Sequence, residues 1–229
     1  MDIKELKKES AFKAVEQIKS GMIVGLGSGS TTLYAIKRIG ELIDNGTLNN
    51  IVGIATSVEV ENEAKELGIP LSSFDEHTKI NLTIDGADEV DENLNLIKGG
   101  GGALLREKVV AQASEREIII VDETKISKHL GEKWSVPIEV LKFAAGLEKE
   151  YLESIGGKVK LRTGDSGGPY ITDEGNYIFD TNFGVIGKPN ELAQLLQARA
   201  GIVEHGIFIN LADEVIVSSH AGINSLKKK

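Results

Sequence analysis

The sequence contains no cysteine, so no disulfide can form. It also has no apolar stretch that approaches the roughly 20 residues of a transmembrane helix. Its first residues, Met1 to Lys8, lack the basic and then apolar layout of a secretory signal. We therefore expect a soluble, cytoplasmic protein that does not act at a membrane.

The sequence also has few histidines and fewer basic than acidic residues. The four histidines lie far apart without metal-ligand spacing, so the sequence indicates no metal site. Acidic residues outnumber basic ones by 35 to 26, and the resulting net charge of −9 disfavours nonspecific binding to nucleic acid. An anionic ligand must therefore be attracted by local donors.

The first half of the sequence alternates helical and strand patterns, which is typical of a parallel sheet with crossover helices. We therefore expect an α/β domain with a Rossmann-like, mostly parallel sheet. The periodicity predicts helices near 6–18, 31–43, 58–67 and 103–113, and strands near 23–25, 51–55, 80–84 and 118–121.

The pattern changes near Lys128, after which strands and helices no longer alternate strictly. This change predicts a smaller inserted α+β domain of ferredoxin-like type over 131–206, with 1–130 and 207–229 forming the main domain. In it we expect strands at 134–141, 159–162 and 170–180 and helices at 147–155 and 190–198, and we expect 207–209 and 215–217 to return to the main sheet.

A glycine-rich loop over 25–32 follows the first expected strand and opens a helix. Its backbone amides and hydroxyls favour a phosphate. The NAD fingerprint would need glycine at Ser30, and a nucleotide phosphate loop would need a lysine that is missing here. A tight turn capped by Ser or Thr explains the loop equally well.

The acidic segment Asp85-Gly86-Ala87-Asp88 stands at the carboxyl end of a predicted strand, where ligands of α/β sheets bind. Neighbouring carboxylates suit proton exchange, because their mutual repulsion raises one pKa. The alternative is an acidic loop in which Asp88 caps a turn. We interpret the acidic residues that follow, Glu89, Asp91 and Glu92, as a solvated rim.

A lysine and four glycines, Lys98 to Gly102, come shortly after the acidic segment and enter an apolar helix. A linker is a poor explanation for so short a run, so we expect backbone amides exposed to a ligand. Glu107 lies on the helix that follows and can alternatively be a solvent-facing residue between Arg106 and Lys108. Carboxylates and a lysine around glycines indicate proton transfer on a small anionic substrate.

These segments together resemble the type A ribose-5-phosphate isomerase family over nearly the whole chain. The matching segments are Gly25 to Thr31, Asp85 to Asp88, Lys98 to Gly101, Arg106 to Lys108, Asp122 to Lys125, Leu161-Arg162, Ile171 to Asn176 and Gly201 to Phe208. The C-terminal stretch Ser218 to Asn224 departs from the threonine-rich ending of many members.

The resemblance implies interconversion of ribose 5-phosphate and ribulose 5-phosphate in the pentose phosphate pathway. It also implies that no metal or organic cofactor is used and that the protein is a homo-oligomer, a dimer or else a tetramer. Glu107 is then the general base, Lys98 stabilises charge on the substrate oxygens, and Asp85 and Asp88 bind hydroxyls or move protons. The expected substrate-binding residues are Ser28, Gly29, Ser30, Thr31, Gly86, Ala87, Gly99, Gly100, Gly101, Lys125 and Lys7.

Two other functions remain open. A sugar-phosphate-sensing module would keep the binding residues without catalysis, but it should carry an output domain, and the sequence shows no basic helix for DNA. An acyl-CoA transferase-like enzyme would use a glutamate beside a glycine-rich loop to attack a thioester. No segment of the sequence marks a nucleotide-sized site.

Overall fold

A computed structural model describes residues 2–228 and divides them into two compact units. The first unit comprises the described residues up to Ala87, Arg106–Lys125 and the described residues from Asn210 onward. The second comprises Asp88–Leu105 and Ile126–Ile209. No helix within 2–228 is long and apolar enough to cross a membrane.

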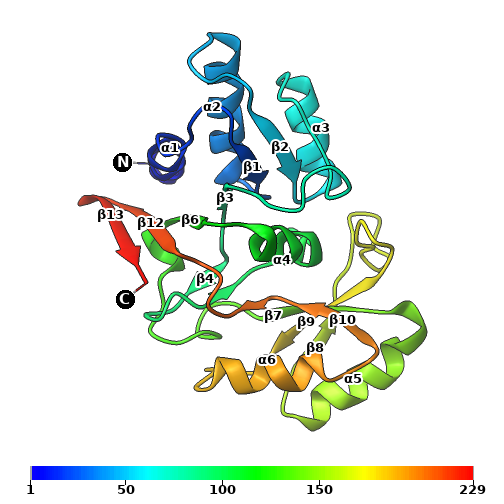
Figure 1. The fold of residues 1–229 in the computed structure, drawn as a ribbon. Coiled ribbons are helices and arrows are strands. Elements are labelled where there is room, and N and C mark those ends of the chain that lie inside the picture. Colours follow the sequence, from blue (N-terminus) through cyan, green and yellow to red (C-terminus); the bar gives the residue numbers. More distant parts are fainter. Residues whose placement is uncertain (1, 229) are drawn as a thin grey trace. The chain divides into compact units, whose positions relative to one another are not determined.

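The first unit is built on a six-stranded sheet. Its strands are β1 (Ile23–Leu26), β2 (Val52–Ala55), β3 (Leu82–Asp85), β6 (Glu117–Asp122), β12 (Glu214–Ser219) and β13 (Gly222–Lys227). Its helices are α1 (Ile3–Val15), α2 (Thr32–Asp44), α3 (Val58–Glu66), most of α4 (Leu104–Ala113) and the 3₁₀ helix η1 (Glu123–Lys125). The order is β13-β12-β6-β3-β1-β2, and every neighbouring pair is parallel except β12 and β13 (Figure 1). The predicted mostly parallel α/β sheet is therefore confirmed.

The strand order creates a topological switch point in this sheet. The chain leaves β1 through α2 to β2 on one side, and after the neighbouring strand β3 it continues by way of α4 to β6 on the other side. Connections that leave in opposite directions open a crevice outside the carboxyl ends of the two strands, and ligands of open α/β sheets bind there. The loop after β1 and the acidic segment after β3 both begin at these carboxyl strand ends.

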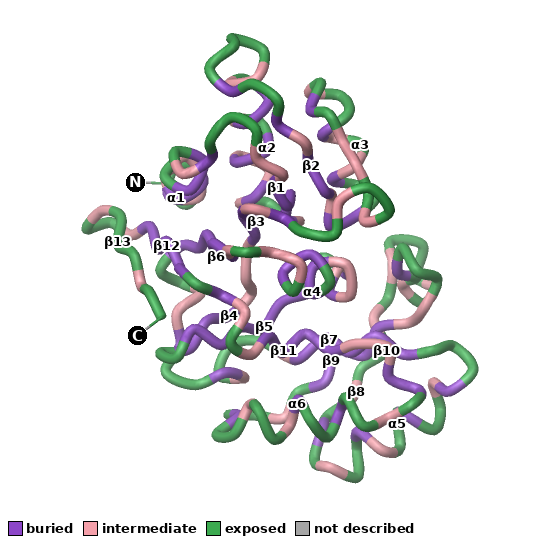
Figure 2. Tube along the Cα trace, viewed as in Figure 1, coloured by how far each residue is buried: buried purple, intermediate pink, exposed green. Residues whose placement is uncertain are grey.

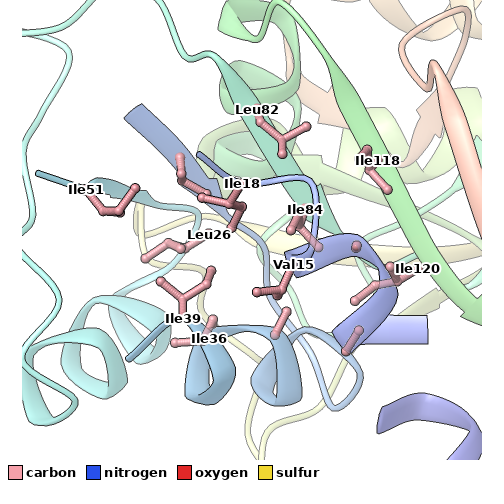
Figure 3. Packing of buried hydrophobic residues seen from close by; sticks show 14 of the residues in the cluster. Val15, Ile18, Leu26, Ile36, Ile39, Ile51, Leu82, Ile84, Ile118 and Ile120 are labelled. Carbon is pink, nitrogen blue, oxygen red and sulfur yellow. The ribbon is translucent and has the colours of Figure 1, made fainter. Parts of the chain in front are cut away.

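An apolar core holds the helices of the first unit against the sheet. Ile36 and Ile39 of α2 and Val15 of α1 pack with Leu26, Leu82, Ile84, Ile118 and Ile120 from the strands (Figure 3). The central strands are buried along their length, whereas the helices present exposed outer faces (Figure 2). Truncating one such side chain to alanine typically costs about 2–5 kcal/mol, so this core fixes the positions of the strand ends.

The second unit contains two antiparallel sheets. One has β7 (Val136–Val140), β8 (Lys158–Leu161), β9 (Tyr177–Asn182) and β10 (Ile202–His205) with helices α5 (Ala145–Ser154), α6 (Pro189–Gln197) and η2 (Lys142–Ala144). Its strand order is β10-β7-β9-β8, and its chain order of strand, helix, two strands, helix and strand is that of the ferredoxin-like motif. The other sheet has β4 (Glu89–Val90), β5 (Leu96–Ile97) and β11 (Ile207–Phe208).

Two expectations about strands are wrong. Residues 207–209 do not return to the main sheet, because Ile207 pairs with Ile97 and both side chains join the apolar core of the second unit. The strand expected over 170–180 begins only at Tyr177, because the amide of Thr172 donates to the carbonyl of Asn176 at 3.0 Å and closes a turn. The expected return of 215–217 to the main sheet is confirmed in β12.

The compact units differ from the domain boundaries expected from the sequence. Residues 88–105 belong to the second unit, since β4 and β5 pair with each other and with β11. A division into 1–130 plus 207–229 and 131–206 placed these residues in the main domain. That division stays a prediction, because contacts describe compactness rather than independent folding.

The rim expected at Glu89 and Asp91 is wrong as well. Glu89 is fully buried, and its carboxylate accepts the amides of Gly131 at 2.8 Å and Lys133 at 3.0 Å. Asp91 is buried and accepts the amide of Asn95 at 2.9 Å. The charges of the neighbouring residues in sequence gave no indication of these backbone partners. Of the three acidic residues assigned to the rim, only Glu92 is exposed.

Glu139 of β7 predicts a pH-dependent stability. Its side chain is buried, and burial raises the pKa of Glu139 above its ordinary value of 4.5, while hydrogen bonds from Asn176 and Thr172 act in the opposite direction. The native state therefore holds this proton more tightly than the unfolded state does, and the contribution of Glu139 to stability falls as pH rises above 4.5. Glu139→Gln removes this loss, so the melting temperature of the variant should gain on that of the wild type as pH rises. A difference that is constant across pH would contradict the prediction.

Candidate active site

The loop after β1 is packed directly against Asp85 at the end of β3. The amide of Gly27 donates to the carbonyl of Ile84 at 3.0 Å, which extends the ladder between the two strands. A Cβ on Gly27 would lie 2.2 Å from Asp85 Oδ1 and 2.5 Å from Asp85 Cα. Only glycine fits this approach, so the sequence motif has a steric reason at this position.

Asp85 is fully buried at the switch point. Its Oδ1 accepts the amide of Ser28 at 3.1 Å and the amide of Gly86 at 2.7 Å. Hydrogen bonds to a carboxylate are short and strong, so they fix both this side chain and the start of the glycine-rich loop. The structure thus brings Asp85 and Ser28 together at the ends of two neighbouring strands.

The hydroxyl of Ser28 contacts two hydroxyls that the sequence did not single out. Ser28 Oγ lies 2.8 Å from Thr56 Oγ1 and 2.9 Å from Ser57 Oγ, at the end of β2. Ser57 caps α3 by accepting the amide of Val60 at 3.1 Å. The sequence could have indicated these two residues, because Thr56 and Ser57 follow a predicted strand and therefore also stand at a carboxyl strand end.

The rest of the loop is accessible. Gly29 and Ser30 are exposed, and Gly29 has a φ of +116°, a left-handed conformation that glycine adopts readily. The ammonium of Lys7 donates to Ser30 Oγ at 2.9 Å, so α1 supplies a positive charge to this loop. Thr31 is the N-cap of α2. Backbone amides, hydroxyls and a lysine are the donor set that suits a phosphate.

Two further site residues of the first unit lie at the same edge of the sheet or on a neighbouring helix. Lys125 is half-buried at the end of η1, directly after β6, whose carboxyl end is beside that of β3. Glu107 is 5% exposed in the first turn of α4. The alternative interpretation of Glu107 as a solvent-facing residue is therefore wrong.

The second unit holds Asp88 and the glycine run. The amide of Gly100 donates to Asp88 Oδ2 at 2.7 Å, and a Cβ on Gly100 would lie 2.7 Å from Asp88 Oδ1. Gly99 and Gly102 have φ values of +98° and +91°, and the amide of Gly102 donates to the carbonyl of Gly99 at 2.9 Å. The run is therefore a tight, ordered turn around a carboxylate rather than a linker.

Lys98 leads into this turn directly after β5. It is 2% exposed, and its Nζ lies 5.5 Å from the ring centroid of Phe208 on β11. Its amide donates to the carbonyl of Gly206 at 2.9 Å. A buried lysine is rare in proteins because removing the charge from water is costly, so it is a candidate for a functional charge.

The predicted site residues thus divide between the units. Asp85, Gly86, Ala87, Glu107, Lys7, Lys125 and the loop from Ser28 to Thr31 belong to the first unit, and Asp88, Lys98 and Gly99 to Gly101 belong to the second. Only Gly86 and Ala87 separate Asp85 from Asp88 along the chain. Among residues 2–228 no group of three or more His, Cys, Asp or Glu side chains could hold a metal ion.

Comparisons with known proteins identify the family. The family model of ribose 5-phosphate isomerase A (phosphoriboisomerase A) matches residues 52–222. The chain belongs to this family. The ribose-5-phosphate isomerase A of Desulfatibacillum aliphaticivorans is 53% identical to it over 97% of this chain and 96% of that protein.

Solved structures of the same isomerase family have the same fold as this chain. The ribose 5-phosphate isomerase of Plasmodium falciparum is 44% identical, with a TM-score of 0.95 and 99% of each chain covered. A D-ribose-5-phosphate isomerase in complex with phospho-erythronic acid is 42% identical, with a TM-score of 0.97, and the similarity covers 99% of this chain and all of that one. The resemblance carried by the glycine and acidic motifs is therefore confirmed at the level of the family.

Proposed function

We propose that this protein interconverts D-ribose 5-phosphate and D-ribulose 5-phosphate, an aldose-ketose isomerisation in the non-oxidative pentose phosphate pathway. Family membership over nearly the whole chain supports the reaction class. The observation that carries the proposal for the site is the buried carboxylate of Asp85 at the switch point. It accepts a hydrogen bond from the amide of Ser28, in the glycine-rich loop that suits a phosphate. This arrangement places a carboxylate beside donors for an anion, as a sugar phosphate requires.

In this proposal Glu107 is the general base. Its carboxylate takes the proton from C2 of the open-chain aldose and returns it to C1, so the reaction passes through an enediolate. Lys98 stabilises the negative charge that develops on O1 and O2. Asp85 and Asp88 bind the sugar hydroxyls, and one of them moves the proton between O1 and O2.

The phosphate binds at the loop from Ser28 to Thr31, with Lys7 and Lys125 as its positive charges, and the sugar contacts Gly86, Ala87 and Gly99 to Gly101. Support comes from the contact of Lys7 with Ser30 and from the place of Lys125 at the end of β6. The net charge of −9 makes such local donors necessary.

Replacing Lys125 by alanine tests the phosphate site. We expect the KM for ribose 5-phosphate to rise at least about 10-fold with a smaller change in kcat, because a charged hydrogen bond contributes about 1.5–3 kcal/mol. Steady-state kinetics give both constants, and Lys188→Ala on an exposed ion pair with Glu191 is the control. An unchanged KM would remove Lys125 from the site.

The activity itself is tested with purified protein treated with EDTA. Rapid formation of ribulose 5-phosphate from ribose 5-phosphate is expected, and unchanged turnover after EDTA would support a reaction without a metal. Binding of the sugar phosphate without turnover would favour the sensing module instead. Exchange of acyl groups between CoA esters would favour the transferase.

We also propose a homo-oligomer in the cytoplasm, a dimer or else a tetramer, that binds neither nucleic acid nor membrane. Support comes from the family relation and from the acidic net charge, which disfavours anionic partners. Sedimentation equilibrium of the purified protein distinguishes monomer, dimer and tetramer.

A further inference from the structure

The carbonyls of the glycine run are held by two side chains of the second unit, Arg162 and Tyr170. Arg162 Nη1 donates to the carbonyl of Gly99 at 2.9 Å and to that of Gly100 at 3.1 Å. The hydroxyl of Tyr170 donates to the carbonyl of Gly101 at 3.3 Å. Three successive peptide groups are thus fixed from their carbonyl side.

Arg162 is itself held in one orientation. Its Nε and Nη2 donate to the two carboxylate oxygens of Asp180 on β9, at 3.0 Å and 2.5 Å. The side chains of Arg162 and Asp180 are only 13% and 29% exposed. A planar guanidinium bound at two points to a carboxylate has little rotational freedom, so its remaining nitrogen is aimed at the carbonyls.

The glycine run needs such support more than other loops do. Glycine has the largest conformational freedom in the unfolded chain, and the φ values of +98° at Gly99 and +91° at Gly102 are accessible to few other residues. Because the C=O and N–H of a trans peptide unit point in opposite directions, fixing a carbonyl also fixes the amide that follows it. Asp88 holds the amide of Gly100 from the other side.

We propose that Arg162, clamped by Asp180, is a positioning residue that fixes the peptide units of Gly99 to Gly101 in the orientation that binds substrate. The inference rests on the proposed role of the glycine run as a substrate-binding segment. Arg162 contributes through two hydrogen bonds to backbone carbonyls and does not act on the reacting atoms. Lysine cannot replace it, because one ammonium cannot span Asp180 and two carbonyls.

The test compares Arg162→Met with Arg199→Met. Arg199 forms a similar pair in the same unit, with Nε and Nη2 donating to Glu148 at 3.0 Å and 3.2 Å, but it does not contact the glycine run. Phospho-erythronic acid, the ligand in the 42% identical isomerase structure, is the binding probe, and we expect it to occupy the proposed substrate site of this chain. We expect Arg162→Met to lower kcat/KM about 10-fold and to weaken binding of this acid by a similar factor, since misplaced binding groups lose rate and affinity together. Arg199→Met should lower the melting temperature while it keeps kcat/KM within about twofold of the wild type.

Two further variants test the positioning role of Arg162 if Arg162→Met fails to fold. Asp180→Asn leaves the guanidinium donors in place but loosens their clamp, so a loss of about 3-fold in kcat/KM is expected. Arg162→Lys retains the charge and should not restore activity. Wild-type kinetics in Asp180→Asn and in a folded Arg162 variant would overturn the inference.

Gly101→Ala separates this inference from the site on which it rests. A Cβ at Gly101 meets no protein atom within 4 Å, and its φ lies outside the left-handed region, so the added methyl should leave the turn intact and affect only a ligand bound against it. Impaired binding in Gly101→Ala with normal kinetics in Arg162→Met would reject the positioning role and keep the glycine run. Normal kinetics in both would reject the glycine run as a substrate-binding segment, and the inference with it.

Discussion

Replacing Glu107 by glutamine should lower kcat at least ~100-fold, because the amide preserves the shape of the side chain but cannot accept the substrate proton. The first turn of α4 holds this side chain buried, so the variant is not expected to reorient it into solvent. Stopped assays of ribulose 5-phosphate formation give kcat. The affinity for phospho-erythronic acid should change much less, since that ligand transfers no proton to carbon.

Deuterium exchange makes this prediction specific to proton transfer. In D₂O the wild type should exchange the substrate hydrogen that moves between C2 and C1, and Glu107→Gln should do so at least ~100-fold more slowly. Glu107→Asp keeps a base on a shorter side chain, so its turnover should lie between the two. The control is Glu148→Gln, which removes a buried carboxylate paired with Arg199. Near-normal turnover in Glu107→Gln would reject Glu107 as the base.

Positions in the fold that depend on the local sequence pattern were predicted well. Strand and helix periodicity gave the elements of the main sheet, and the rule that ligands bind at carboxyl strand ends placed the loop after β1 and Asp85 at one edge. The structure adds the reason for the motif: Gly27 leaves room for the carboxylate of Asp85, and Ser28 donates to it.

Residues that act through long-range pairing could not be found in this way. Glu89 looked like a surface charge, but its partners, Gly131 and Lys133, come from a segment more than forty residues later in the chain. The contact of Arg162 with the glycine run could not be predicted from sequence, because Arg162 follows a strand that pairs with a distant segment of the chain. Such contacts depend on which distant segments of the chain are brought together, and local periodicity does not determine that.

Lys98 carries the second large expected effect. Lys98→Met should lower kcat about 100-fold with a small change in KM, because a fixed positive charge in a site shielded from water stabilises the enediolate more than the neutral substrate. Methionine has a similar length and removes only the charge and its hydrogen bonds. Circular dichroism and thermal melting establish that the variant is folded before its kinetics are compared.

The matched control for Lys98 is Lys142→Met. Both ammonium groups lie 5.5 Å from an aromatic ring centroid, that of Phe208 for Lys98 and that of Tyr177 for Lys142, but Lys142 is exposed and belongs to no candidate site. Its loss should leave kcat within about twofold of the wild type.

Phospho-erythronic acid provides a second readout, because its carboxylate carries a negative charge shared by two oxygens, and the enediolate likewise carries negative charge on O1 and O2. If Lys98 stabilises that charge, Lys98→Met must weaken binding of this acid in proportion to the loss in kcat/KM. A fall in kcat without weaker binding of the acid would instead assign Lys98 to the support of the glycine turn.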